Sequence, residues 1–343
     1  MNLFGDQFDQ IGPVLEAYPP DCEPQAVEPL AGAGGLSGAR FWRLRTTRGD
    51  LCLRRWPVEH PAEDRLQFIQ AVLWHVQREG FEQVPVPVEA TSHAGYVSHA
   101  GHFWQLEPWM AGRADVRPVT SPPRLEAALT ALARFHLAAA SFPLSQATAV
   151  GAPGIVARLE QTERLLAGEL DTLGRLVAGG RQAGHAGYRD RAERIVRLAP
   201  LAAPAVRDQL SLAARMRVRL QPCIRDIHRG HVLFERDEVT GLIDFGAMRP
   251  DGVAGDVARL LGSMAGDDQQ AWRGGLSAYS AIIPLAEGES RLVTAYDRGT
   301  VLLSGINWIR WIFQDRRHFD DPAEVLARMD EVLRRLERLA GGY

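Results

Sequence analysis

The alternation of apolar and polar residues predicts short strands in the first third of the chain. Residues 39–45 and 50–56 alternate with a period of two on either side of a turn at 47–49, which is typical of an antiparallel hairpin. Residues 65–78 instead carry apolar side chains at helical spacing, and residues 84–87 return to extended chain. From about residue 29 to residue 109 the pattern therefore indicates a small lobe rich in sheet.

Beyond Gly112 the period changes to that of long helices. One is expected after Ser121-Pro122, others over 155–177 and over 188–216 with a break near Pro200, and a last one from Asp321-Pro322. Between them lies a different segment, 223–248, whose apolar runs at 232–234 and 239–243 flank a polar turn. We therefore divide the chain into a lobe of residues 1–110 and a helical lobe of residues 111–343 that carries the hairpin of 223–248.

Composition narrows the classes of partner. The chain has 343 residues, of which 46% are hydrophobic, which is enough for a core divided over two lobes. With 39 basic and 42 acidic residues the formal net charge is −3, so we expect neither nucleic acid nor a membrane surface as a partner. Every basic residue is arginine, so any chemistry that needs a lysine ammonium must use another cation.

Cysteine usage and the N-terminal residues bear on the compartment. The three cysteines, Cys22, Cys52 and Cys223, form no Cys-x-x-Cys pair, which argues against a zinc ribbon or a disulfide framework. The first 20 residues contain acidic side chains and lack a basic start before an apolar run, and no apolar stretch is long enough to span a bilayer. We therefore expect a cytoplasmic protein.

Two carboxylates flank the predicted hairpin. Asp226 precedes its first strand and Asp244 follows its second, so both are expected to emerge at the same edge of a rigid element. Phosphoryl transfer uses such a pair, because one carboxylate orients or accepts the proton of the attacking hydroxyl while the other holds Mg²⁺ against the phosphates. Asp226 suits the first role and Asp244 the second. The alternative is that both merely cap turns, as aspartates at strand ends often do.

The residues around these carboxylates resemble a known family. Asp226-Ile-His-Arg-Gly-His231 followed by Ile243-Asp-Phe-Gly246 is similar to the H-G-D-x-H-x-x-N and I-D-F/W segments of the aminoglycoside phosphotransferase and choline kinase-like family. Asp251 and Asp256-Val-Ala resemble its D-x-x-x-x-D-L-A run, whose acidic residues mainly support the loop. The helix that ends in Phe-His136 resembles the family's helix ending in L-H.

The resemblance implies a fold, an activity and cofactors. The implied fold is α+β and bilobal, protein-kinase-like, with a small β-rich N-terminal lobe for the nucleotide and a larger, mainly helical C-terminal lobe for the acceptor. The implied activity is ATP-dependent phosphorylation of a hydroxyl on a small-molecule acceptor, with Mg²⁺, or Mn²⁺ as an alternative, as the metal. Neither the acceptor nor the oligomeric state follows from the sequence.

The order of motifs in the first lobe matches the kinase signature set and implies a nucleotide site. A glycine-rich loop can approach phosphates, the strand cation takes the place of the kinase lysine, and the segment after residue 106 is placed to carry adenine. Arg54 is preferred to Arg55 as that cation, since it shares a strand face with Cys52. The candidate nucleotide-binding residues are Gly34, Gly35, Ser37, Gly38, Arg54, Glu107 and Trp109. Trp109 has a second interpretation, as an aromatic residue packed between the lobes.

Some positions depart from the family pattern. His231 stands where the family has an asparagine that contacts metal, and we retain it as a candidate metal ligand beside Asp244. Residues 65–78 lack the glutamate expected to pair with the strand cation and offer only Gln67 and Gln70. Two outcomes stay open, an active kinase and a catalytically weak or inactive nucleotide-binding pseudokinase. A zinc pair formed by His228 and His231 is a third, weaker interpretation.

Candidates for the walls of the acceptor site lie in the last part of the chain. Trp308, Arg310, Trp311, Arg316 and Arg317 combine aromatic and basic character, which would suit an acceptor that is not polycationic. The two tryptophans are spaced i, i+3, however, which is more often the inward stripe of a core helix than a binding surface.

Overall fold

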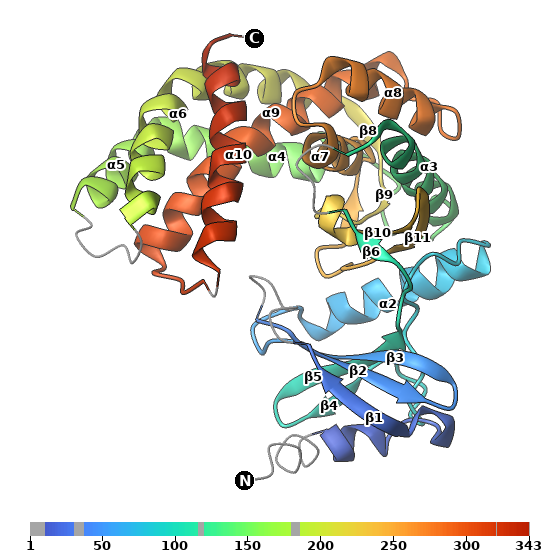
Figure 1. Cartoon of the computed structure of the whole chain (residues 1–343). Helices are drawn as coiled ribbons and strands as arrows, with labels where there is room; N and C mark the ends of the chain where they lie inside the picture. The colour runs from blue at the N-terminus through green and yellow to red at the C-terminus, as the bar shows by residue number, and fades with distance from the viewer. Residues whose placement is uncertain (1–10, 31–37, 116–119, 180–185, 320, 343) are drawn as a thin grey trace. The chain divides into compact units, whose positions relative to one another are not determined.

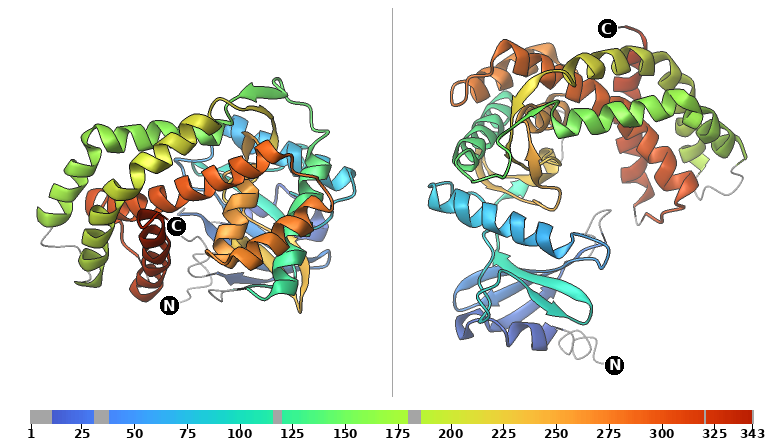
Figure 2. Two further views of the ribbon diagram at one scale, coloured as in Figure 1. Left: turned by 90° about the horizontal axis from the view of Figure 1, so that it is seen from above. Right: turned by 180° about the vertical axis from the view of Figure 1, so that it is seen from behind.

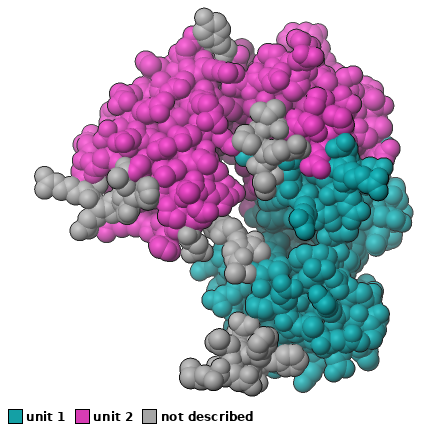
Figure 3. Space-filling view, viewed as in Figure 1, with its two compact units in different colours: residues 1–116, 137–142, 229–248 teal, residues 117–136, 143–228, 249–343 magenta. Residues whose placement is uncertain are grey.

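The computed structural model describes residues 11–30, 38–115, 120–179, 186–319 and 321–342. Two compact units divide the chain, and Figure 3 colours them separately. Unit 1 consists of Met1–Val116, Leu137–Phe142 and Arg229–Met248, and unit 2 of Arg117–His136, Pro143–His228 and Arg249–Tyr343. Asp244, in the segment Arg229–Met248, thus belongs to unit 1, whereas Asp226 belongs to unit 2. The lobe boundary expected after residue 110 stays a prediction.

Unit 1 is built on a five-stranded antiparallel sheet with the order β1-β2-β3-β5-β4 (Figure 1). The strands are β1 (Pro24–Pro29), β2 (Arg40–Thr46), β3 (Gly49–Arg55), β4 (Val97–His99) and β5 (His102–Pro108). The predicted hairpin of β2 and β3 is confirmed, with Arg40 paired to Arg55 and Thr46 to Gly49. Strand β1 was not predicted, because proline stands at both of its ends. Its place at the sheet edge explains why proline is tolerated there.

The two faces of this sheet have different partners. One face carries the core of unit 1, in which Trp42, Leu53 and Leu106 pack with Tyr18 from the N-terminal segment. The other face carries polar side chains of β2, β3 and β5. Helix α2 (Glu63–Arg78) lies over this face, as Figure 1 and the rear view in Figure 2 show. The strands are therefore amphipathic, with every second residue of β2, β3 and β5 available for chemistry beneath α2.

A second sheet in unit 1 holds the predicted metal loop. Strands β10 (Val232–Glu235) and β11 (Glu238–Leu242) form the predicted hairpin, and β10 also pairs with β6 (Arg113–Ala114). Gly112 precedes β6 with φ +94°, and a Cβ there would lie 2.4 Å from Thr240 Oγ1 and 2.9 Å from the Phe234 carbonyl oxygen. Only glycine fits at this position, so the approach of β6 to the hairpin depends on it.

Unit 2 is mainly helical. Its helices are α3 (Pro122–Ala139, shared with unit 1), α4 (Pro153–Arg164), α5 (Leu170–Gly179), α6 (Ala186–Ala213), α7 (Ala254–Ala265), α8 (Gln269–Ser280), α9 (Glu287–Ile309) and α10 (Pro322–Ala340). The predicted break near Pro200 is wrong, since α6 continues through Pro200 and Pro204. Packing of α6 on α9 and α10 explains why the helix continues where local sequence predicts an end.

Two short antiparallel ribbons complete unit 2. Strand β7 (Thr148–Val150) pairs with β8 (Arg217–Arg219), and β9 (Gln221–Cys223) pairs with β12 (Arg249–Asp251). In the second ribbon, β9 leads into Asp226, the candidate catalytic residue, and β12 leads into helix α7.

Among the residues that the structure describes, no helix is both long enough and apolar enough to cross a membrane.

Candidate phosphotransferase site

In unit 1 the polar face of the sheet brings together two rows of aligned residues. The strand register places Arg54 of β3 between Phe41 of β2 and Gln105 of β5. In the next row along the same face, Cys52 stands between Arg43 and Glu107. The prediction that Arg54 and Cys52 share a face is therefore confirmed. Sequence reasoning missed Gln105, because its place depends on pairing between strands about 50 residues apart.

Arg54 is a buried cation held by aromatic rings and one carboxylate. Arg54 is only 5% exposed, and its Nη2 donates to Asp244 Oδ1 at 3.2 Å. The guanidinium carbon lies 3.4 Å from the Trp56 ring centroid and 5.1 Å from that of Phe41. Nε has no hydrogen-bond acceptor among the described residues. One donor of this buried guanidinium is therefore unsatisfied by the protein.

Asp244 is the carboxylate on which these contacts converge. Its backbone adopts a left-handed conformation, with φ 60°, directly after strand β11. Oδ2 lies 3.6 Å from His231 Nε2, in the 3-10 turn Arg229–His231. Burial alone would raise the pKa of Asp244, but Arg54, His231 and the Gly246 N–H that donates to the carboxylate together hold it below its usual value. Asp244 is therefore ionised and ready to coordinate a cation.

Glu107 is a second acidic group on this face, with a different protonation state. Burial raises its pKa to about 7, although the neighbouring Arg54 and the donor Gln105 act to lower it and the charge of Asp244 acts to raise it. Gln105 Nε2 donates to Glu107 Oε2 at 2.6 Å, and Gln70 of α2 donates to Gln105 Oε1 at 2.9 Å. Near neutral pH Glu107 therefore exists in both protonation states.

Helix α2 contacts the site through amides and an arginine instead of a glutamate. Gln70 is buried and also donates to the Gly95 carbonyl oxygen at 3.0 Å, while Gln67 donates to the Tyr96 hydroxyl at 3.2 Å. Arg65 Nη2 donates to the carbonyl oxygen of Gly246 at 2.6 Å. The helix is thus tied to the sheet and to the loop of Asp244, and the cation on β3 pairs with that loop.

The remaining candidate nucleotide residues are placed in part. The Trp109 N–H donates to the Asp50 carbonyl oxygen at 3.0 Å, and the Arg43 guanidinium lies 4.6 Å from the Trp109 ring centroid. Gly38 has φ +75°, as a turn before β2 requires. Gly34, Gly35 and Ser37 lie outside the described residues, so the glycine-rich loop stays a prediction.

In unit 2 the candidate catalytic aspartate is held by an arginine. Asp226 Oδ1 accepts a hydrogen bond from Arg259 Nη2 at 3.0 Å, and 51% of the Asp226 side chain is exposed. The preceding residue, Arg225, has φ 69°, a conformation that non-glycine residues rarely adopt. The sequence pattern did not indicate Arg259, which lies on helix α7 about 30 residues downstream. Exposure and charge both suit Asp226 for contact with a hydroxyl.

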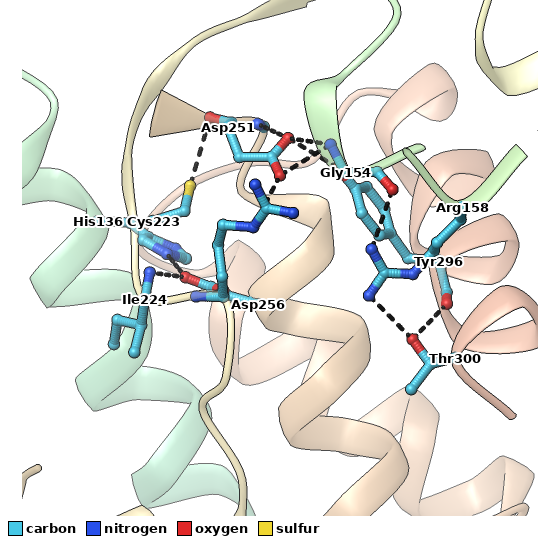
Figure 4. A network of polar contacts seen from close by, with 11 residues as sticks. His136, Gly154, Arg158, Cys223, Ile224, Asp251, Asp256, Tyr296 and Thr300 are labelled. Carbon is cyan, nitrogen blue, oxygen red and sulfur yellow. Dashed lines mark hydrogen bonds and ion pairs between the residues drawn. The ribbon is translucent and has the colours of Figure 1, made fainter. Parts of the chain in front are cut away.

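The loop before Asp226 is fixed by the buried carboxylate of Asp256 (Figure 4). Asp256 accepts from the backbone N–H groups of Ile224 at 2.7 Å and Arg225 at 2.6 Å. It also contacts His136 Nε2 at 3.1 Å, and the other ring nitrogen of His136 contacts the Tyr279 hydroxyl at 2.8 Å. These four contacts define the path of the chain into Asp226.

Asp251 supports the same region from strand β12 (Figure 4). Its carboxylate accepts from the N–H groups of Gly154 at 3.1 Å and Gly252 at 2.9 Å, and from the Tyr296 hydroxyl at 2.8 Å. Arg225 Nε lies 3.5 Å from Asp251 Oδ2. The interpretation of Asp251 and Asp256 as supporting residues agrees with these contacts and with their exposures of 2% and 1%.

A buried group in unit 2 has the composition of a metal site. Possible ligand atoms of His136, Cys223 and Asp256 lie within 4.8 Å of one another. Each of these residues already has protein partners, however: the two nitrogens of His136 contact Tyr279 and Asp256, and Cys223 Sγ donates to the Asp251 carbonyl oxygen at 3.3 Å. The cluster is therefore a hydrogen-bonded support.

The residues considered for acceptor walls divide between core and surface. Trp308 is 5% exposed and packs edge-on against Trp311, with centroids 5.1 Å apart, so the core interpretation holds for Trp308. Arg310 Nη2 donates to Glu169 at 2.6 Å. Arg317 lies over the Trp311 ring, with 5.3 Å between its guanidinium carbon and the ring centroid.

Three solved structures share the fold of this chain and are distant from it in sequence. An aminoglycoside phosphotransferase from Alicyclobacillus acidocaldarius matches with a TM-score of 0.62 and 16% identity, over 96% of this chain and 95% of that one. The amicoumacin kinase hAmiN in complex with AMP-PNP, Ca²⁺ and Ami matches with a TM-score of 0.61 and 12% identity, over 99% and 94%. A spectinomycin phosphotransferase in complex with ADP and spectinomycin gives 0.56 and 11%, over 95% and 98%.

These structures confirm the predicted α+β, protein-kinase-like fold. No curated protein matches the chain. The model of the phosphotransferase enzyme family matches residues 30–292, which is more than half of the chain. The protein therefore belongs to the phosphotransferase enzyme family.

Proposed function

We propose that the protein transfers the γ-phosphate of ATP to a hydroxyl of a small-molecule acceptor. The observation that carries the proposal is the pairing of buried Arg54 with Asp244 beneath α2, since it joins a phosphate-binding cation to an ionised carboxylate in one unit. Arg54 has an unused Nε–H donor, which a phosphate oxygen would satisfy. We also infer a cytoplasmic location, because the reaction consumes ATP.

The residues around Asp244 fit a divalent cation. Mg²⁺ prefers carboxylate oxygens, and 42% of the Asp244 side chain is exposed, so an ion can reach it. Asp244 would hold the metal with His231 beside it. Mn²⁺ accepts an imidazole ligand more readily than Mg²⁺ does. When bound, the metal supplies positive charge that stabilises the phosphoryl group in the transition state of its transfer. With a metal held by Asp244, Arg54 would be available to bind the nucleotide phosphates.

Asp226 orients the acceptor hydroxyl in this proposal. The acceptor oxygen forms a bond to the γ-phosphorus while the bond between that phosphorus and the bridging oxygen breaks, and ADP leaves with the electron pair. The hydroxyl proton passes to Asp226. Arg259 keeps the Asp226 carboxylate turned in one direction through Oδ1, and Asp256 fixes the backbone that carries it.

The acceptor class follows from the relatives only in outline. The amicoumacin kinase and the spectinomycin phosphotransferase were each solved with a small-molecule antibiotic. We propose an acceptor of that size with a free hydroxyl. Since Arg259 already neutralises Asp226, a polycationic acceptor would gain little from this carboxylate.

The test compares Asp226→Asn with the wild type in label transfer from γ-labelled ATP to a panel of hydroxylated small molecules, with Mg²⁺ or Mn²⁺. The expected result is transfer by the wild type and a loss of roughly 10³-fold or more in the variant, at unchanged ATP affinity. Asp208→Asn is the matched control, since Asp208 lies in the same unit and pairs only with the adjacent Arg207 among the contacts described. Equal transfer by Asp226→Asn would reject the assignment, and ATP binding without transfer to any acceptor would favour the pseudokinase alternative.

A further inference from the structure

Trp56 of unit 1 lies beside Arg54. It directly follows β3 and is 2% exposed. Its N–H donates to the Phe103 carbonyl oxygen at 2.8 Å, and its own carbonyl oxygen lies 2.8 Å from His102 Nδ1. The backbone of Trp56 is therefore held to strand β5, and the starting point of its side chain is fixed.

The indole ring contacts both halves of the phosphate and metal site. The guanidinium carbon of Arg54 lies 3.4 Å from the ring centroid, a stacking distance. A Cβ at Gly246 would lie 3.2 Å from Trp56 Cζ3 and 3.3 Å from Asp244 Oδ1, so the loop of Asp244 runs close to the same ring. The Trp56 ring thus lies beside both Arg54 and the loop that carries Asp244.

Packing holds the Trp56 ring in place, since its side chain forms no hydrogen bond with the described residues. Trp56 Nε1 has no acceptor among the described residues, and the same is true of Arg54 Nε. A guanidinium 5% exposed, with a single carboxylate partner, depends on its aromatic neighbours for its orientation. Of the two rings that face it, Trp56 is the nearer, at 3.4 Å against 5.1 Å for Phe41.

We propose that Trp56 is a positioning residue for ATP, which acts through Arg54. Its ring face fixes the guanidinium in the orientation that reaches Asp244, and the same orientation presents Arg54 to the nucleotide phosphates when metal occupies Asp244. The inference rests on the proposed function. The ring face carries the effect, and the indole N–H does not.

The test measures the Kd of ATP by calorimetry for Trp56→Phe and Trp56→Leu. Trp56→Phe keeps an aromatic face and should stay within about threefold of the wild type, while Trp56→Leu should weaken ATP binding by roughly tenfold. Trp42→Leu is the matched control: Trp42 is similarly buried, on β2, but packs in the core on the opposite face of the sheet. It should lower Tm and leave the Kd of the folded protein unchanged.

A double-mutant cycle tests whether Trp56 acts through Arg54. In the background of Arg54→Gln, Trp56→Leu should change the Kd by less than about twofold, because the cation that the ring positions has been removed. An undiminished tenfold effect in that background would overturn the proposal, as would equal ATP affinity of Trp56→Leu and wild type. If Trp56→Leu fails to fold, Trp56→Met replaces it in both arms.

Failure of the inference is distinguishable from failure of the proposed function. Wild-type protein that binds ATP tightly, together with a Trp56→Leu variant that binds it equally well, removes the role of Trp56 and leaves the kinase proposal intact. Wild-type protein that does not bind ATP at all contradicts both.

Discussion

Replacement of Glu107 by glutamine should stabilise the protein above neutral pH. The folded protein raises the pKa of Glu107 from 4.5 to about 7, chiefly through burial. The native state therefore holds a proton between pH 4.5 and pH 7 that the unfolded chain has released, so the free energy of unfolding falls as pH rises through this window and is constant above it. Glutamine is neutral at every pH and can still accept the hydrogen bond from Gln105.

The size of the effect follows from the same difference in pKa. At about 1.4 kcal/mol for each pH unit, it is worth roughly 3 kcal/mol, reduced to about 2 kcal/mol because Glu107 is only partly buried. For a unit of this size, that gain raises Tm by roughly 4–8 °C.

Calorimetry at pH 4.5, 6, 7 and 8 measures the prediction. The Tm of Glu107→Gln should exceed that of the wild type at pH 8 and equal it near pH 4.5. Glu28→Gln, on the exposed edge strand β1, is the matched control and should show no such divergence. A Glu107→Gln variant that is less stable than the wild type at pH 8 would refute the reasoning, since it would mean that the ionised carboxylate is stabilised by Arg54 more than burial penalises it.

Further predictions concern the supports of the site. Asp256→Ala should destabilise unit 2 by about 3–5 kcal/mol, seen as a lower denaturation midpoint, because it leaves two buried N–H groups and His136 without their acceptor; a loss below about 1 kcal/mol would contradict this. Gly112→Ala should cost at least about 2–3 kcal/mol by the same measure, because of its positive φ and the 2.4 Å approach to Thr240, and a neutral effect would show that β6 can move away from the hairpin. All three cysteines are buried with raised pKa values, so a thiol reagent should label the native protein slowly and the denatured protein at three sites, and rapid native labelling would place a cysteine at the surface.

Local pattern was sufficient for the elements whose boundaries depend on nearby residues. The hairpin of β10 and β11 follows from apolar runs around a polar turn, and α10 begins at Pro322 with Asp321 as its N-cap, as expected. Strand β1 and the continuity of α6 were missed, because tertiary packing and an edge position override the local preference of proline.

The parts of the site that sequence could not predict depend on register over long separations. Arg54 was identified from its strand, but its partner was not, because the pairing with Asp244 spans 190 residues. Glu107 was assigned to adenine through its position, whereas the structure adds a carboxylate with a pKa of about 7 linked through Gln105 to Gln70. Strand alternation places Gln105 and Glu107 on one face of β5, but only the pairing of β3 with β5 places them beside Arg54 and Cys52.

The chain passes from unit 2 to unit 1 between His228 and Arg229, so that Asp226 and Asp244 belong to different units although only 17 residues separate them. Arg54, Trp56 and Glu107 all belong with Asp244, and Arg259, Asp256 and Asp251 with Asp226. Under the proposed function, selection on the phosphate donor and selection on the acceptor would then fall on separate sets of side chains. A lineage could change one preference through substitutions in a single unit and leave the other intact.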